Sequence, residues 1–198
     1  MKSMNDLFLQ SLQDIYYAEK QGLRGLQKIA KAVESQALKD ALLNHREQSQ
    51  HQVERLEQVF VQLGKRPRGK TCQAMNGLMA EGEEEIAEGE KGAVLDAALI
   101  AAGQSIEHYE IARYGSLLAW AKALGMNEAG ALLQQTLEEE KQSDALLSEI
   151  AERALNQQAA EENGGEEAGG EEDEGTKNDG KVKARSRPKP KARTAAKK

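Results

Sequence analysis

Apolar residues recur every three or four positions in the first third of the chain. One stripe of this kind runs through residues 7–33, and a second runs from Leu38 to Leu63. This spacing is typical of amphipathic helices. The break between the stripes holds Ser35, a residue type that often caps helix N-termini. We therefore expect the two segments to form a helical hairpin.

A second hairpin is predicted further along the chain. Asp96 opens a segment that is apolar on almost every side, as expected of a deeply buried helix, and Gly125 follows its end. Asn127 is the expected N-cap of the next helix, whose apolar stripe reaches Ala154. Residues 64–92 separate the two hairpins and are rich in glycine. They predict a long connection with one short helix inside it.

This order of elements predicts an all-α fold, a ferritin-like four-helix bundle with a long crossover connection. Two helical hairpins joined by one long connection are the topology of that class of bundle. We place the bundle at residues 1–158. Residues 159–198 are expected to form a disordered tail, acidic and glycine-rich at first and then basic, because neither part has enough apolar residues to form a core.

Composition excludes several classes of protein. The chain has 198 residues, a net charge of −6 and a single cysteine, Cys72. One cysteine cannot form an intramolecular disulfide framework or a Cys-based zinc site. The first residues lack the apolar region of a signal peptide, and no apolar run is long enough for a membrane span. We expect a cytoplasmic protein with no membrane partner.

The basic end of the tail suggests a further partner. Residues 181–198 contain nine Lys and Arg and no acidic residue, so they could neutralise several phosphates of DNA or RNA. The nine acidic residues of 161–180 can compete for the same cations. Two roles for the tail therefore remain as alternatives. It binds nucleic acid weakly and without sequence preference, or its acidic and basic parts neutralise each other and it only keeps the protein soluble.

Six polar residues fall on the inward-facing stripes of the predicted helices. Counting 100° per residue places one on the first helix, one on the second and two on each of the last two. Measured from the hairpin turns, most of them lie within about two helical turns of one another. They are Glu19, His45, Glu107, Glu110, Glu140 and Asp144.

Five inward carboxylates need positive partners. An ionised carboxylate that is desolvated without a partner costs several kcal/mol, and Arg113 and His45 are too few to neutralise five. Iron(II) or manganese(II) would do so, because carboxylate and imidazole ligands suit these ions. We therefore expect a dinuclear iron or manganese site. The alternative is a metal-free polar core satisfied by protonation, Arg113 and water.

Three segments, residues 15–21, 106–115 and 137–144, resemble the YciF-like, ferritin-like proteins of bacteria, which are associated with stress responses. The resemblance covers roughly residues 4–155, and its most specific part is Glu107-His108-Tyr109-Glu110. It implies a ferritin-like or rubrerythrin-like bundle, a dimer and a two-metal centre. It implies no settled reaction.

The chain departs from the usual ligand pattern of di-iron bundles. Those bundles place Glu-x-x-His on two helices. Here the second helix reads Glu47-x-x-Gln50, and the fourth reads Glu140-x-x-Ser143. We favour His45 as the ligand from the second helix, with Glu47 and His51 as the alternative if that helix is rotated.

These observations lead to one main functional hypothesis and two alternatives. The main hypothesis is a dinuclear metal-binding protein that acts in stress protection through iron(II), oxygen or peroxide chemistry. If it turns over, it is an oxidoreductase of the ferroxidase or peroxidase type. The alternatives are a non-enzymatic helical homodimer with a polar core, and a scaffold for a nucleic-acid-binding tail. A homodimer is expected because the third long helix is apolar on nearly every side.

Overall fold

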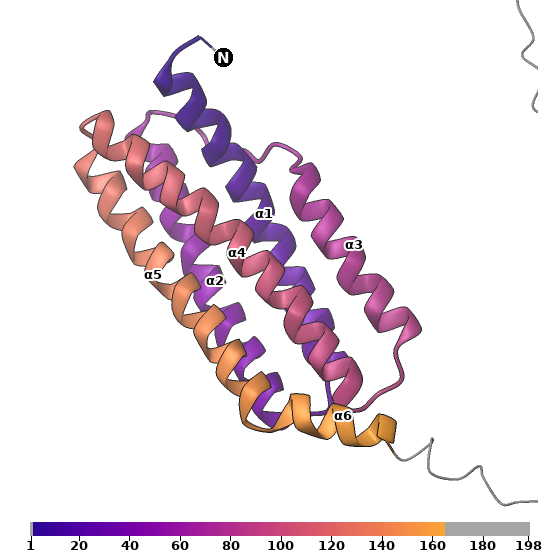
Figure 1. Cartoon of the computed structure of the whole chain (residues 1–198). Helices are drawn as coiled ribbons and strands as arrows, with labels where there is room; N and C mark the ends of the chain where they lie inside the picture. The colour runs from indigo at the N-terminus through magenta and orange to yellow at the C-terminus, as the bar shows by residue number, and fades with distance from the viewer. Residues whose placement is uncertain (1, 165–198) are drawn as a thin grey trace, which may run out of the picture.

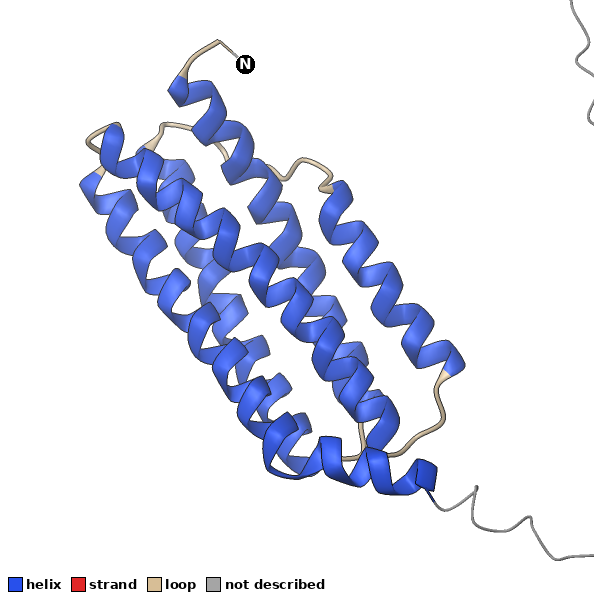
Figure 2. Ribbon diagram, in the orientation of Figure 1, coloured by secondary structure: helices blue, strands red, loops and turns tan. Residues whose placement is uncertain are grey.

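The computed structural model describes residues 2–164 and confirms the all-α prediction, because every regular element in this range is helical (Figures 1 and 2). None of these helices combines the length and the apolar character needed to cross a membrane. The tail beyond residue 164 lies outside the described residues. The elements are α1 (Met4–Ala32), α2 (Gln36–Gln62), α3 (Gln73–Glu88), α4 (Ala93–Ala123), α5 (Asn127–Ile150), a π-helical turn (Ala151–Leu155) and α6 (Asn156–Gly164).

The four long helices form the predicted bundle of two hairpins. α1 packs against α2 and α4, and α5 packs against α2 and α4, so that the four helices enclose one core (Figure 1). The connection between α2 and α4 is long, as the sequence predicts, and it carries α3. The topology of a ferritin-like bundle is therefore confirmed.

The short helix in the crossover covers the outer side of the bundle. α3 packs against α1 and α4 (Figure 1), and its Met75 is fully buried. A Cβ atom added at Gly25 of α1 would lie only 2.7 Å from Cε of Met79, so the two helices are closely apposed there. Part of the apolar surface of α4 is thus covered within the chain itself. The homodimer stays a prediction.

Side-chain caps hold the ends of the hairpins. The predicted cap at Ser35 is confirmed, because its hydroxyl accepts a hydrogen bond from the Leu38 N–H at 3.3 Å. The buried Asp96 carboxylate accepts two more, from the N–H groups of Glu34 at 3.0 Å and Ser35 at 2.7 Å. The first turn of α4 is therefore tied to the α1–α2 turn.

The α4–α5 turn differs in one detail from the prediction. Gly125 has a φ of +69°, which explains the glycine after α4. Asn127 is not the N-cap of α5, because the chain enters the helix one residue earlier. Met126 occupies the cap position without a side-chain bond, and its carbonyl accepts the hydrogen bond of the Gly130 N–H at 2.8 Å.

Helical structure also continues past residue 158, where we placed the end of the bundle. α6 runs to Gly164 and packs against α4. Leu155 is buried in the core, and Ala159, four residues later, packs against the same cluster. Leu155 and Ala159 therefore extend the apolar stripe beyond Ala154, the last position at which we expected it.

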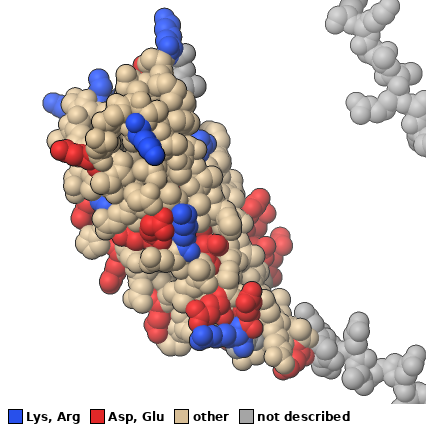
Figure 3. Space-filling model, turned by 60° about the vertical axis from the view of Figure 1, so that its left-hand side comes forward, with Lys and Arg blue, Asp and Glu red and all other residues tan. Residues whose placement is uncertain are grey.

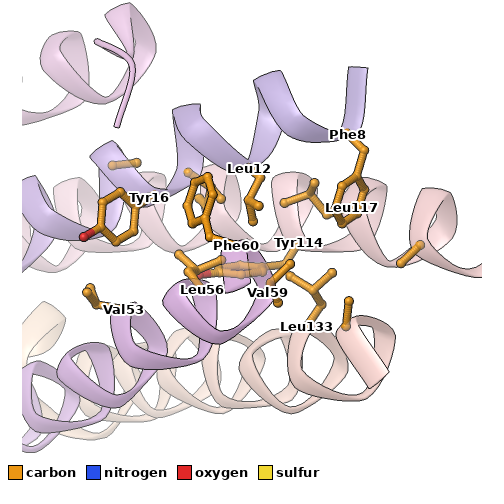
Figure 4. Packing of buried hydrophobic residues seen from close by; sticks show 14 of the residues in the cluster. Phe8, Leu12, Tyr16, Val53, Leu56, Val59, Phe60, Tyr114, Leu117 and Leu133 are labelled. Carbon is orange, nitrogen blue, oxygen red and sulfur yellow. The ribbon is translucent and has the colours of Figure 1, made fainter. Parts of the chain in front are cut away.

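The core consists of two apolar clusters, one toward each end of the bundle. The first lies toward the α4–α5 turn and is shown in Figure 4; it includes an edge-to-face pair of Tyr16 and Phe60 with ring centroids 5.5 Å apart. The second lies toward the α1–α2 turn and includes Leu38, Leu99 and Leu147. In each long helix the residues between the two clusters include buried polar side chains. A polar layer therefore crosses the middle of the core.

The surface of the described chain carries charges of both signs. Residues 2–164 hold 26 Asp and Glu against 17 Lys and Arg. On the face shown in Figure 3, acidic side chains gather toward the α6 end with Lys and Arg among them, and the opposite end carries scattered Lys and Arg side chains separated by uncharged surface. This face offers no continuous basic surface to a polyanion. The basic segment 181–198, on which the nucleic-acid prediction rests, lies outside the described residues.

Candidate metal centre

The polar layer brings together five of the six predicted site residues, and all five are buried. Their ligand atoms fall into two groups of three, and within each group the atoms lie within 4.8 Å of one another. One group consists of His45, Glu107 and Glu140. The other consists of Glu19, Glu110 and Glu140. Glu140 belongs to both groups, so its carboxylate stands between two adjacent ligand sets.

In the first group His45 lies against two carboxylates. Its Nε2 atom is 3.1 Å from Oε1 of Glu107 and 3.6 Å from Oε2 of Glu140. The Ser143 hydroxyl donates a second hydrogen bond to Oε1 of Glu107, at 3.0 Å. Burial raises the pKa of Glu107, but the hydrogen bond and charge of His45, with the hydrogen bonds of Glu140 and Ser143, outweigh burial and bring this pKa below its usual range.

The pKa of the His45 imidazole shifts in the opposite direction from that of Glu107. Burial lowers the pKa of His45, but its hydrogen bond to Glu107 and the negative charges of Glu107 and Glu19 outweigh burial, so this pKa is raised. Without metal, His45 and Glu107 therefore favour a buried ion pair. With metal, His45 must be neutral to act as a ligand.

In the second group the carboxylates repel one another. Burial raises the pKa of Glu19 to about 7, although the Tyr114 hydroxyl stabilises its charge by donating a hydrogen bond of 2.5 Å. Burial and the charges of Glu19 and Glu107 raise the pKa of Glu110 well above its usual value. Burial and the charge of Glu110 do the same to the pKa of Glu140. In the metal-free layer, burial and mutual repulsion therefore favour the protonated forms of Glu110 and Glu140.

The same layer contains most of the unpartnered polar atoms of the core. Among the described residues, six buried side-chain nitrogen or oxygen atoms have no hydrogen-bond partner, and five of the six belong to the two groups. Leaving such an atom unpaired costs roughly 1–3 kcal/mol. The six atoms are His45 Nδ1, Gln52 Oε1, Glu107 Oε2, Glu110 Oε1, and Oε1 and Oε2 of Glu140.

The chemistry of these residues fits a pair of divalent cations. Carboxylates and imidazole are ligands of iron(II) and manganese(II). Four ionised carboxylates carry a charge of about −4, which two divalent ions would neutralise while His45 stays neutral. The unpartnered carboxylate oxygens provide the lone pairs that such ions need. The residues present therefore suit a dinuclear centre in which Glu140 is shared.

The sixth predicted ligand, Asp144, lies outside both groups. Its Oδ1 atom accepts a hydrogen bond from Nε2 of Gln104 at 3.1 Å and lies 3.4 Å from Nε2 of His108. The Asp144 side chain is 22% exposed. Asp144 lies about 40° around α5 from Glu140. At that position it is partly exposed and pairs with α4 side chains.

Three other residues weighed from the sequence also lie away from the centre. Glu47 and His51 are exposed, and His51 pairs with Glu54 at 3.3 Å, so α2 does not have the rotated orientation that would bring them inward. The guanidinium of Arg113 lies over the Tyr109 ring, 5.2 Å from its centroid. It therefore does not neutralise the cluster.

An arginine that the sequence analysis overlooked borders the layer. Arg55 makes two hydrogen bonds to Glu139, at 2.6 and 2.8 Å, and one to the Thr136 hydroxyl at 2.7 Å. Gln52 donates a further bond to Glu139 at 3.2 Å. A sequence signal for this network exists, since Arg55 follows the inward-facing Gln52 by three residues and shares its side of α2.

A model of the family described as "Domain of unknown function (DUF892)" matches residues 3–160. The chain belongs to this family. Among DUF892 relatives, Protein YciF of Escherichia coli strain K12 is 44% identical over 160 residues, which are 80% of this chain and 96% of YciF. The resemblance to YciF-like proteins seen in the sequence is thereby confirmed.

Solved structures agree with this assignment. The crystal structure of the E. coli stress protein YciF matches with a TM-score of 0.76 over 79% of this chain and 99% of that chain, at 44% identity. YcfI of Rhodopseudomonas palustris matches with a TM-score of 0.73 over 74% and 94%, also at 44% identity. A protein from Xanthomonas campestris pv. campestris, 21% identical with a TM-score of 0.63 over 81% and 99%, shares the fold.

Proposed function

We propose that this DUF892 protein binds a dinuclear iron or manganese centre and acts in stress protection through iron(II), oxygen or peroxide chemistry. The observation that supports the centre most strongly is the pair of buried three-residue groups that share Glu140. The stress role is supported by the 44% identity to YciF, which is described as a stress protein. A cytoplasmic location and a homodimer are part of the same proposal.

Each helix of the bundle supplies a defined part of the centre. His45 and Glu107 would hold one ion, Glu19 and Glu110 would hold the other, and Glu140 would bridge the two. A bound iron or manganese pair would supply one-electron redox changes and open positions for an oxidant. An activity of this kind would be that of a ferroxidase or a peroxidase.

Two hydroxyl groups position ligands rather than supply them. Ser143 donates to Oε1 of Glu107 and leaves Oε2 of that carboxylate free to bind. Tyr114 donates to Oε1 of Glu19, and its own pKa is raised well above the usual value by burial and by the charge of Glu19. Tyr114 therefore stays protonated and orients Glu19 as a hydrogen-bond donor.

Metal stoichiometry tests this proposal ligand by ligand. Full-length protein, purified without a metal-affinity tag, is dialysed against manganese(II), and bound metal is measured per chain. We expect about two ions in the wild type, as in other two-metal bundles. Glu19→Gln and His45→Gln each disable one group and should retain about one ion. Glu140→Gln removes the shared ligand and should bind the least.

Glu138→Gln is the matched control, because Glu138 lies two residues before Glu140 on α5 but is exposed and pairs with Lys141. It should bind as much metal as the wild type. A metal-free polar core predicts no stoichiometric binding in any of these proteins. That result, or equal binding in the wild type and Glu140→Gln, would contradict the proposal.

A further inference from the structure

A cavity of about 210 Å³ lies beside the candidate metal centre, between α1, α2, α4 and α5. One end of it is formed by buried ligand candidates, among them Glu19, His45 and Glu110. Most of the remaining wall is aliphatic. The aliphatic wall residues include Leu26, Ile29, Leu42, Ile106, Leu146 and Leu147.

The volume and the wall are those of a site for an organic molecule. A cavity of about 150 Å³ lined by aliphatic and aromatic side chains is large enough to take up benzene. The present cavity is larger, and besides the ligand candidates its polar lining consists of uncharged amides and hydroxyls, those of Asn44, Gln48, Ser49, Gln142 and Ser143. Water that fills its aliphatic part would find few hydrogen-bond partners, so an apolar group gains free energy by replacing it.

The rim of the cavity carries no charge. Four of the residues that line it are exposed, and they are Asn44, Gln48, Gln142 and Leu146. A hydrated cation meets no carboxylate at this rim, and an anion meets no Lys or Arg before it reaches the buried carboxylates. Entry therefore favours uncharged molecules.

We infer that this cavity binds an uncharged organic molecule that has an apolar body and one hydroxyl or hydroperoxide group. The polar group points to the end of the cavity that Glu107 and Glu110 line. The apolar body lies against the aliphatic wall. The inference deepens the proposed function, on which any chemistry at the polar group rests, by naming an organic substrate class for the same site.

Binding to the metal-free full chain tests the inference separately from the metal centre. The probe is 2-phenyl-2-propanol, titrated by calorimetry in the presence of a chelator. Saturable binding is expected, and Gly103→Met should weaken it roughly tenfold or more, because the added side chain occupies cavity volume. A Cβ at Gly103 meets only Cδ1 of Leu147, at 3.5 Å, so the helix tolerates the change.

Gly115→Met is the matched control. Gly115 lies on the same helix, but a Cβ there has nothing within 4 Å and Gly115 does not line the cavity. This variant should bind the probe as the wild type does. Glycerol and benzoate, tested on the wild type, should bind at least about tenfold more weakly, because glycerol lacks an apolar body and benzoate would lose its hydration in a cavity lined by no Lys or Arg.

Two results would overturn the inference: no saturable binding of the probe to the wild type, or equal affinity in Gly103→Met. If Gly103→Met does not fold, the wild-type affinities for 2-phenyl-2-propanol, glycerol and benzoate test the inference. Equal affinity for all three compounds would refute it. Manganese stoichiometry on the same samples separates the two proposals. A wild type that binds the alcohol but no metal upholds the cavity and refutes the centre.

Discussion

Tyr114 makes the most direct contact between the apolar core and the candidate ligands. It is fully buried in the cluster shown in Figure 4, and its hydroxyl donates to Glu19. A hydrogen bond to a charged group contributes about 1.5–3 kcal/mol. Tyr114→Phe should therefore lower the free energy of unfolding of the metal-free protein by about that amount at pH 8, where Glu19 is ionised, and by less at pH 5. Urea unfolding at both pH values measures this.

Tyr16→Phe is the control for this change. Its hydroxyl also donates to a glutamate, Glu57 at 2.7 Å, but outside the polar layer. Its effect on the free energy of unfolding should change little between pH 5 and pH 8. An equal pH dependence in the two variants would contradict the role given to Tyr114.

Raised carboxyl pKa values give the metal-free protein a distinctive pH dependence. Glu19 has a pKa of about 7 in the folded chain, against 4.5 for an exposed glutamate, so the folded state binds the proton more tightly. Stability from this group is complete below pH 4.5 and is lost as the pH rises through 7. The loss is about 3 kcal/mol for Glu19 alone, and Glu110 and Glu140 add to it in the same direction.

The measurement is chemical unfolding between pH 5 and 8 in the presence of a chelator. Glu19→Gln should flatten the curve, because it removes one titrating group and keeps the shape of the side chain. With manganese(II) the trend should reverse, since metal competes better for ligands as protons leave. A free energy of unfolding of the metal-free protein that is constant or rises between pH 5 and 8 would contradict the raised pKa values of these buried carboxyl groups.

For individual site residues, the sequence predicted which side chains are buried but not which hydrogen-bond partners they have. The stripe positions of Glu19, Glu107 and Glu110 placed them inside, where the structure has them. Asp144 satisfied the same angular count, yet one turn along α5 was enough to move it toward the surface and His108. Angular counting assumes a straight helix with a fixed inner face, and it contains no information on which side chains compete for a carboxylate.

Among the elements, the first turn of α4 has the clearest energetic role. Asp96 accepts the N–H groups of Glu34 and Ser35, which otherwise have no helical partner at the α1–α2 turn. Asp96→Ala should lower the free energy of unfolding by about 2–4 kcal/mol, because it leaves two donors without their acceptor. Asp40→Ala on the exposed side of α2 should cost less than about 1 kcal/mol. An equal decrease in the free energy of unfolding in the two variants would show that the Asp96 hydrogen bonds do not stabilise the turn.

Local signals predicted some element boundaries and missed others. Ser35 and Gly125 stand where helices begin or end. Asn127 is the first residue of α5 and not its cap, and α4 begins at Ala93, before Asp96. The packing of α3 and α6 was not predictable in the same way. α6 packs against α4, which is distant along the chain, and α3 packs against both its neighbour α4 and the distant α1. The weak apolar stripes of α3 and α6 do not indicate these packing partners.

The expected homodimer cannot form through the side of α4 that α3 already covers. α3 already packs on α4, so the dimer would have to use other surfaces. The exposed large apolar side chains of the described residues are the candidates, and they are Met4, Leu43, Val61, Val94 and Leu146. Light scattering at micromolar concentration should give twice the 21.6 kDa mass of one chain. A mass of one chain over the whole concentration range would refute the homodimer and leave the metal proposal intact.

The buried carboxylates of the polar layer are retained, in our proposal, because they bind metal. Thermal unfolding of the wild type and Glu140→Gln, each with chelator and with manganese(II), distinguishes this from a metal-free polar core. At a free metal concentration of about 100 Kd each site adds about 2.7 kcal/mol, or roughly 5–11 °C in Tm for a chain of this size. We expect this shift in the wild type. We expect Glu140→Gln to melt no lower than the wild type with chelator and to gain little from metal. A wild-type melting curve that is the same with chelator and with manganese(II) would refute metal binding by the layer.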